Sequence, residues 1–469
     1  MQIYDSVQKK KVPFEPIRKG EASIYVCGPT VYDDAHLGHA RSALAFDLLS
    51  RTLKALGYKV TMGKNFTDID DKIIKKVEET GRSLEEITTH YIARYLEEMD
   101  ALGVARADIE PKATESLDAI EQMIQKLIEK DAAYLVSSGD VYFDTSKDVH
   151  YGDISRQVGE DEENQSRIEH TDEKRNPKDF ALWKACKGDE DICFDTAFSR
   201  GRPGWHIECS AMIEKHFAHT HGTESYSIDI HGGGADLLFP HHENEAAQSR
   251  CATGHELAKY WMHNGFVQID GEKMSKSLGN SFFLKDALSV YDGEILRYYL
   301  NSVHYRNNFN FNEEDLLAAK KRLDKLYRLK KRVVPGKGSA VNKAFKEALL
   351  EAMSDDLNVS IALAVIDEMV AKANEQLDSN PKDKALKKET IANIAFIDTL
   401  LGFGGKEPYA YFQIGIDEAL KAKIETLLSE RSEAKKAKEF ERSDAIRDEL
   451  TALGIAIMDT AEGTVWEKA

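Results

Sequence analysis

Two short stretches combine histidine or lysine with glycine at spacings suited to binding phosphate. His36-Leu37-Gly38-His39 follows an apolar segment and precedes leucines repeated every three or four residues, as on one helix face. The histidines therefore belong to a strand-to-helix turn, where free backbone N–H groups attract anions. Lys273-Met274-Ser275-Lys276-Ser277 lies in a glycine-flanked loop, so its two lysines suit a clamp on phosphate oxygens. Either motif alone is also found in ordinary loops, so only the pair is specific.

A second set of residues offers ligands for a metal ion. Cys27 ends the apolar segment before the first motif, and Cys209 lies in an expected helix that opens at Gly204. His241 and Glu245 are four residues apart, so a helix places both on one face. Two thiolates, an imidazole and a carboxylate suit tetrahedral Zn²⁺. Taken singly, each has an ordinary structural explanation, and the spacing does not choose between His241 and the adjacent His242.

The segments around these residues alternate between strand and helix patterns. We expect a strand at 22–27, a helix at 40–56 and a strand at 59–63, which predicts a parallel sheet with ligands at the carboxyl ends of its strands. The glycine-rich segment 229–236 is interpreted as a turn after a strand, and 134–143 as a hairpin.

Composition narrows the class of protein. The net charge of −18 argues against a nucleic-acid partner, yet residues 320–332 hold eight lysines and arginines against one acid, Asp324. Five cysteines argue against a disulfide framework and for the reducing cytoplasm. No apolar run reaches the ~18 residues that span a bilayer, and the first residues lack a signal-peptide pattern. We therefore expect a cytoplasmic protein with no membrane partner.

The pairing of H-x-G-H with K-M-S-K-S resembles the class I aminoacyl-tRNA synthetases. With Cys27 and the segments 205–209, 231–234 and 241–245, the chain is similar in particular to the cysteinyl-tRNA synthetases over nearly its whole length. The resemblance implies that ATP, with Mg²⁺, converts L-cysteine to cysteinyl-adenylate and diphosphate. The cysteinyl group then passes to the 3′ end of tRNA(Cys). One Zn²⁺ per chain would bind the substrate thiolate, which serine cannot imitate.

The same resemblance implies a role for individual residues. The catalytic residues would be His36, His39, Lys273 and Lys276. ATP would contact Gly28, Thr30, His36, Gly38, His39 and Lys276. The cysteine or adenylate pocket would contain Thr67, Trp205, His231 and Asp236. The zinc ligands would be Cys27, Cys209, His241, preferred here over His242, and Glu245.

We expect an α/β protein with a Rossmann-like doubly wound catalytic domain, an insertion, a helical bundle and a small C-terminal α+β module. The expected bounds are 1–115 and 201–265 for the two halves of the catalytic domain, 116–200 for the insertion, 266–335 for the K-M-S-K-S loop and stem-contact helices, 336–405 for the bundle, and 406–469 for an anticodon-binding module. A monomer is expected.

Two other functions fit the central motifs. An ATP-dependent ligase of the same fold joins cysteine to an amino sugar, but it has no need of the basic stripe at 320–332 or of the terminal module. A non-catalytic RNA-binding protein with a structural zinc would not need intact phosphate-binding motifs. The basic stripe with the terminal module, and the intact phosphate-binding motifs, therefore favour the synthetase.

Overall fold

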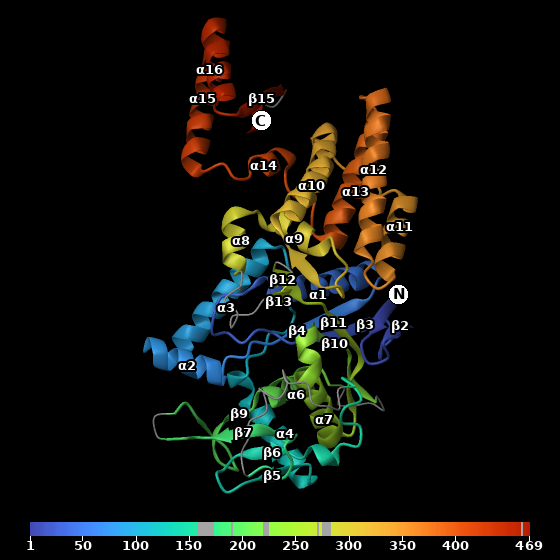
Figure 1. Cartoon of the computed structure of the whole chain (residues 1–469). Coiled ribbons are helices and arrows are strands. Elements are labelled where there is room, and N and C mark those ends of the chain that lie inside the picture. The colour runs from blue at the N-terminus through green and yellow to red at the C-terminus, as the bar shows by residue number, and fades with distance from the viewer. Residues whose placement is uncertain (157–172, 189–190, 219–224, 270–271, 274–282, 461–462) are drawn as a thin grey trace. The chain divides into compact units, whose positions relative to one another are not determined.

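The computed structural model divides the chain into two compact units. It describes residues 1–156, 173–188, 191–218, 225–269, 272–273, 283–460 and 463–469, and Figure 1 labels their helices and strands. The first unit comprises Met1–Asp286, Leu300–Glu313 and Leu349–Ala362, and the second comprises Ala287–Tyr299, Glu314–Ala348 and Leu363–Ala469.

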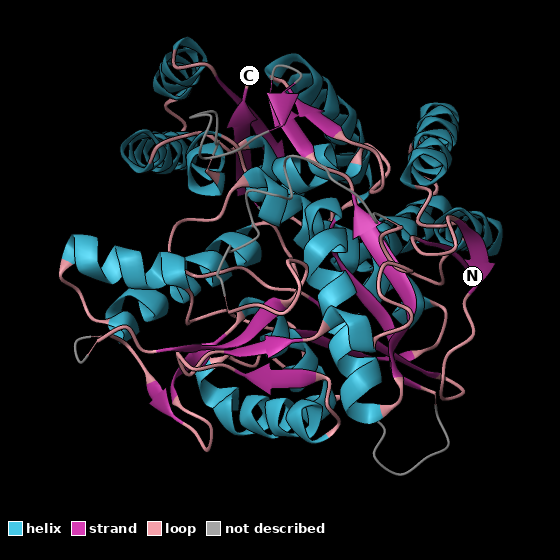
Figure 2. Cartoon of the chain, turned by 60° about the horizontal axis from the view of Figure 1, so that its bottom comes forward, coloured by secondary structure: helices cyan, strands magenta, loops and turns pink. Residues whose placement is uncertain are grey.

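A four-stranded parallel sheet runs through the first unit in the order β11-β10-β3-β4. Its strands are β3 (Glu21–Val26), β4 (Lys59–Lys64), β10 (Tyr226–Gly234) and β11 (Glu256–Asn264). Helix α1 (Leu37–Ala55) connects β3 to β4, which is the predicted crossover between parallel strands. Figure 2 shows the strands of the chain in magenta and its helices in cyan. The predicted doubly wound α/β fold is confirmed.

Helix α1 begins earlier than the predicted residue 40, because His36 caps its N-terminus with a side-chain acceptor. Arg41 then anchors the helix from within the core, with its side chain fully buried. Its guanidinium donates to the backbone carbonyls of Leu300, Val303 (2.9 Å) and His304 (2.8 Å). These bonds fix the helix whose N-cap is His36 and whose first turn contains His39.

The glycines at 232–234 are part of strand β10, so the predicted turn at 229–236 is wrong. A Cβ on Gly232 would lie 2.2 Å from the ring of Phe46 in α1. Here glycine lets the helix pack closely on the sheet. A glycine used for close packing cannot be told from a glycine in a turn by the sequence alone.

The insertion forms a separate antiparallel sheet in the order β5-β6-β7-β9-β8. Its strands are β5 (Ala133–Leu135), β6 (Val141–Phe143), β7 (Phe180–Ala185), β8 (Phe194–Asp195) and β9 (Arg200–Pro203). The pairing of β5 with β6 confirms the predicted hairpin. A disulfide joins Cys186 to Cys193 between β7 and β8, although the cysteine count argued against a disulfide framework. The other three cysteines are free.

The first unit also contains further helices and strands, among them the sheets β1-β2 and β13-β12-β14. They are β1 (Gln2–Asp5), β2 (Lys10–Pro13), α2 (Asp71–Thr80), α3 (Leu84–Ala101), α4 (Leu117–Glu129), α6 (Trp205–His216), α7 (Glu243–Thr253), β12 (Val267–Ile269), β13 (Glu272–Lys273) and β14 (Phe309–Phe311). Helix α6 follows β9 directly, and α7 lies between β10 and β11. Both helices therefore start beside the carboxyl ends of strands.

The second unit is mostly helical. Its helices, some of which cross the boundary between units, are α8 (Leu284–Val290), α9 (Gly293–Asn301), α10 (Glu313–Val333), α11 (Lys343–Ser354), α12 (Val359–Ser379), α13 (Lys384–Leu401), α14 (Pro408–Phe412), α15 (Glu418–Ala437) and α16 (Phe440–Ala452). The chain ends in the antiparallel pair β15 (Ile455–Thr460) and β16 (Gly463–Lys468). Trp466 and Leu450 join β16 and α16 in one small core. Among the described helices, none is long and apolar enough to cross a membrane.

Candidate active site

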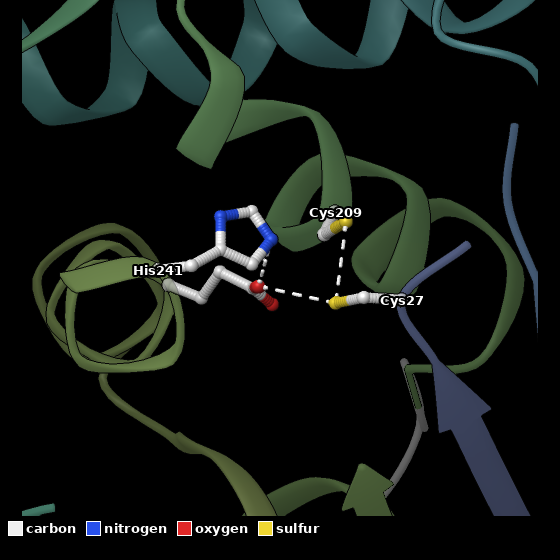
Figure 3. Close-up of side chains that lie close together, drawn as sticks. Cys27, Cys209 and His241 are labelled. Atoms are coloured by element: carbon white, nitrogen blue, oxygen red, sulfur yellow. Dashed lines mark hydrogen bonds and ion pairs between the residues drawn. The ribbon is translucent and has the colours of Figure 1, made fainter. Parts of the chain in front are cut away.

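Four side chains from four segments converge beside the carboxyl end of β3 (Figure 3). Cys27 follows β3, Cys209 lies in α6, His241 lies in the short helix Leu238–His242, and Glu245 lies in the first turn of α7. The sulfurs of Cys27 and Cys209 are 3.7 Å apart, and Oε1 of Glu245 is 3.5 Å from Sγ of Cys27. The potential ligand atoms of all four residues lie within 4.8 Å of one another.

The arrangement of His241 suits a shared cation. Its Nε2 lies 2.7 Å from Oε1 of Glu245, and the two groups form a buried ion pair without a well-aligned hydrogen bond. The nitrogen, the carboxylate oxygen and the two sulfurs thus present donor atoms to one common space.

His231 holds the second oxygen of Glu245. Its Nδ1 donates to the carbonyl of Tyr25 at 2.9 Å, and its Nε2 lies 2.7 Å from Oε2 of Glu245. Burial lowers the pKa of His231, but the charge of Glu245 outweighs this and raises it. A protonated His231 donates through both nitrogens and keeps Glu245 ionised, with Oε1 directed to the cluster.

The thiols respond differently to their surroundings. The hydrogen bond from Cys27 lowers the pKa of Cys209 to about 7, against the opposing effect of burial. Burial raises the pKa of Cys27 well above its usual value, and the nearby Cys209 and Glu245 add to the shift. Without a cation, only one of the two sulfurs is readily ionised.

A second set of potential ligands shares two members with the first. Cys27 and Glu245 also lie close to His231 and His242, with Nε2 of His242 3.4 Å from Sγ of Cys27. However, Nδ1 of His242 contacts Nε2 of His263 at 2.8 Å, and His231 is engaged at both nitrogens. The set with His241 contains two sulfurs, so it suits a soft divalent metal better.

Aromatic and polar side chains border the cluster. The ring of Trp205 stacks on His241 with centroids 4.2 Å apart, and Nδ1 of His206 lies 2.9 Å from Nδ1 of His241. Thr67 is buried and donates to Oε2 of Glu208 at 3.1 Å. Trp205 therefore lies against a candidate ligand, and His231 contacts another.

The H-x-G-H turn presents two histidines as a pair. Their rings stack with centroids 3.8 Å apart. Nδ1 of His36 accepts the N–H of Gly38, and Nδ1 of His39 accepts the N–H of His36. An Nδ1 that accepts a hydrogen bond carries no proton, so the neutral rings carry theirs on Nε2.

The neighbouring turn at 28–31 approaches the segment after β4. The N–H of Gly28 donates to Oδ1 of Asn65 at 2.8 Å, and a Cβ on Gly28 would lie 1.6 Å from the Asn65 carbonyl oxygen. Only glycine fits there. Thr30 and Thr67 form a parallel bridge pair, so Thr30 and the candidate pocket residue Thr67 are neighbours.

The structure does not bring every candidate together. Asp236 lies exposed in a short helical turn after β10 and, among the described residues, is not a member of the cysteine cluster. Lys273 ends strand β13, and Lys276 lies outside the described residues.

Several residues of the site were not among the candidates. Asn65 lies 3.7 Å from Sγ of Cys209 through its Oδ1, and His263 contacts His242. The position of Asn65 just after a strand could have indicated it. His263 lies in β11, a strand that the sequence reading did not predict, so no signal pointed to it.

A parallel sheet with an H-x-G-H turn after its first strand and a K-M-S-K-S segment after its last defines a class I aminoacyl-tRNA synthetase. Solved structures share the fold. A Mycobacterium tuberculosis methionyl-tRNA synthetase in complex with methionyl-adenylate matches with a TM-score of 0.61 at 15% identity, covering 86% of this chain and 96% of that one. A ternary LeuRS–tRNA–LeuAMS complex from Agrobacterium radiobacter K84 matches with a TM-score of 0.60 at 11% identity, covering 85% and 86%.

Sequence comparisons identify the family within that class. Residues 13–321 match the model of the "tRNA synthetases class I (C) catalytic domain", 348–403 a DALR domain, and 417–466 the "Cysteinyl-tRNA ligase anticodon binding domain". The chain is 82% identical to a cysteine–tRNA ligase of Sulfurovum sp. (strain NBC37-1) over 469 residues, which is all of both chains. It is 59% identical to that of Helicobacter pylori (strain P12) over 468 residues, again all of both. The chain belongs to the cysteine–tRNA ligase family, which confirms the predicted class of enzyme.

Proposed function

We propose that the chain activates L-cysteine with ATP, with Mg²⁺, and transfers the cysteinyl group to tRNA(Cys), using one Zn²⁺ to select cysteine. The observation that carries the zinc proposal is the cluster of Cys27, Cys209, His241 and Glu245, whose potential ligand atoms lie within 4.8 Å of one another. The donor set fits zinc, because two soft sulfurs, an imidazole and a carboxylate are its usual ligands.

The cluster and the residues beside it would have three roles in amino-acid selection. Cys27, Cys209, His241 and Glu245 would hold the metal, which when bound supplies a Lewis acid that favours a thiolate over a hydroxyl. His231 fixes the Glu245 carboxylate. Trp205, stacked on His241, supplies an apolar wall for the short side chain of cysteine. Apolar pockets alone separate near-isosteres by only about 1–3 kcal/mol, so a thiol-specific contact removes the need for editing.

ATP would be held on the other side of the short turn after β3. We propose that His36 and His39 donate Nε2–H to phosphate oxygens, helped by the N-terminus of α1, and that Gly28 and Thr30 line the approach. Lys273 and Lys276 would add cations as charge develops on the leaving diphosphate. The substrate carboxylate then attacks the α-phosphate, and no covalent enzyme intermediate is needed.

The terminal region supports tRNA rather than an amino sugar as the acceptor. Residues 417–466 match an anticodon-binding domain. We propose that 266–335 contacts the tRNA stem, that 336–405 forms the bundle, and that the enzyme acts as a cytoplasmic monomer. The 1–115 and 201–265 halves and the 116–200 insertion would form the catalytic domain.

Paired cysteine variants test the proposal. Cys209→Ser should lose about one zinc per chain and most cysteine-dependent exchange of diphosphate into ATP. Cys251→Ser is the matched control, because Cys251 is free and lies outside the cluster. Retention of metal and exchange by Cys209→Ser would refute the ligand assignment.

A further inference from the structure

Asp34 connects the turn before His36 to two helices that are distant in the sequence. Its Oδ2 accepts a hydrogen bond from Nζ of Lys285, at the start of α8, at 2.6 Å. Its Oδ1 accepts one from Nε of Arg94, in α3, at 2.5 Å. The Asp34 side chain is only 11% exposed. A carboxylate so withdrawn from water and shared between two cations has a well-defined position.

Backbone contacts reinforce the same connection. The N–H of Leu284 donates to the carbonyl of Ala35 at 2.8 Å, and His36 pairs with Phe283 in an antiparallel bridge. The chain that leaves the K-M-S-K-S motif is therefore joined to the H-x-G-H turn by main-chain and side-chain bonds within the first unit.

The charges around Asp34 keep it ionised. Burial acts to raise its pKa, but the hydrogen bonds from Lys285 and Arg94 outweigh burial and lower it. Two further acids, Glu97 and Glu98, act on Arg94, and Oε1 of Glu98 lies 3.6 Å from its Nη2. Burial raises the pKa of Glu98 to about 7, and its carboxyl has no hydrogen-bond partner among the described residues. Arg94 thus directs its hydrogen bond to Asp34.

We propose that Asp34 is a positioning residue for adenylate formation, holding Leu284 and Lys285 against the turn that carries His36 and His39. This inference rests on the proposed role of those histidines in binding ATP. Ion pairs with exposed partners usually contribute no more than about 1 kcal/mol to stability. A misplacement of about 1 Å in a catalytic constellation can cost about a hundredfold in rate. Loss of the pair should therefore affect the rate more than the stability.

Diphosphate exchange by Asp34→Asn, Lys285→Met and the double variant tests this role. Each single variant should lower kcat/KM for ATP about tenfold or more. The kcat/KM of the double variant should be no lower than that of the less active single variant. The KM for cysteine, the zinc content and the melting temperature should stay close to those of the wild type. Lys285→Arg, which keeps the cation, should recover most of the rate lost in Lys285→Met.

Asp131→Asn is the matched control, because it removes a carboxylate that pairs with Lys147 in the insertion. It should exchange at the wild-type rate. The inference is overturned if both single variants stay within twofold of the wild type, if their effects multiply in the double variant, or if the KM for cysteine rises as much as that for ATP. His36→Asn in the same assay separates the two proposals. Full exchange by His36→Asn would refute the ATP site itself. Loss of exchange by His36→Asn together with normal exchange by Asp34→Asn would refute only the positioning role.

Discussion

The backbone N–H of His36 donates to Nδ1 of His39 at 3.2 Å, and the rings of the two histidines stack 3.8 Å apart. Nδ1 of His36 accepts the N–H of Gly38 in turn at 3.1 Å. Both rings therefore use one nitrogen to cap α1 and keep Nε2–H as a donor. The motif thus combines a structural cap with two hydrogen-bond donors, which explains why two histidines flank a glycine.

His36→Asn separates the cap from the donor. The asparagine oxygen can still accept the N–H of Gly38, because asparagine is a favoured N-cap residue. It has no equivalent of Nε2–H. We expect diphosphate exchange to fall about a hundredfold or more, the cost of losing one donor to a charged transition state, with a nearly unchanged melting temperature. His36→Ala should lose the same activity and also about 1 kcal/mol of stability. Near-normal exchange by His36→Asn would show that the ring serves only as a cap.

Arg41 should matter for stability far more than a surface arginine. Arg41→Met removes the donor from three carbonyls, that of Leu300 in a buried contact and those of Val303 and His304 in partly buried ones. We expect a loss of about 3 kcal/mol or more in the free energy of unfolding, since each unsatisfied buried group costs about 1–3 kcal/mol. Arg106→Met removes an exposed i,i+4 pair with Glu110 and should cost less than about 1 kcal/mol. Denaturant unfolding of both variants gives the comparison, and equal losses would contradict the anchoring role.

Glu98 should make stability depend on pH between about 4.5 and 7. Burial raises its pKa from 4.5 to about 7 in the folded chain, so the folded state keeps a proton that the unfolded state releases. This carboxyl therefore favours folding most below pH 4.5, and that contribution is lost as the pH rises to 7. Glu98→Gln should leave stability at pH 4.5 nearly unchanged and raise it at pH 8 by up to about 3 kcal/mol. Thermal unfolding at the two pH values measures the difference. An equal gain in stability at both pH values would show that the titration of Glu98 is not the cause of the gain.

His231 should tune the affinity for zinc without binding the metal. His231→Gln removes the cation that holds Oε2 of Glu245. We expect zinc to bind about 10–100-fold more weakly, as is usual when a residue that orients a metal ligand is lost. His255→Gln is the control, because His255 is exposed at the end of α7. Competition with a chromophoric chelator measures both affinities. Unchanged zinc affinity in His231→Gln would mean that Glu245 needs no such support.

The sequence predicted the features that depend on local pattern. The leucine spacing of α1, the hairpin of β5 and β6 and the alternation of strand and helix all have short-range signals. The glycines at 232–234 were misread, because close packing of Phe46 on a strand requires the same residue as a turn. The convergence of Cys27, Cys209 and His241 depends on which strands are adjacent in the sheet. No local spacing encodes that order, and only the resemblance to a family indicated it.

Long-range polar contacts could not be predicted from the sequence for the same reason. Nothing near Asp34 in the sequence indicates Arg94 or Lys285 as its partners, and the bonds from Arg41 reach carbonyls more than two hundred residues away. Backbone carbonyls carry no residue-type signal at all.

The central claim is that zinc at Cys27, Cys209, His241 and Glu245 makes the enzyme select cysteine. The most direct measurement is the charging of tRNA(Cys) with cysteine and with serine, by zinc-loaded protein and by protein stripped with a chelator. Zinc-loaded protein should favour cysteine by about 10⁴-fold or more, and stripping should abolish cysteine charging until zinc is restored. Stripped protein that still charges cysteine at the full rate and still rejects serine would contradict it.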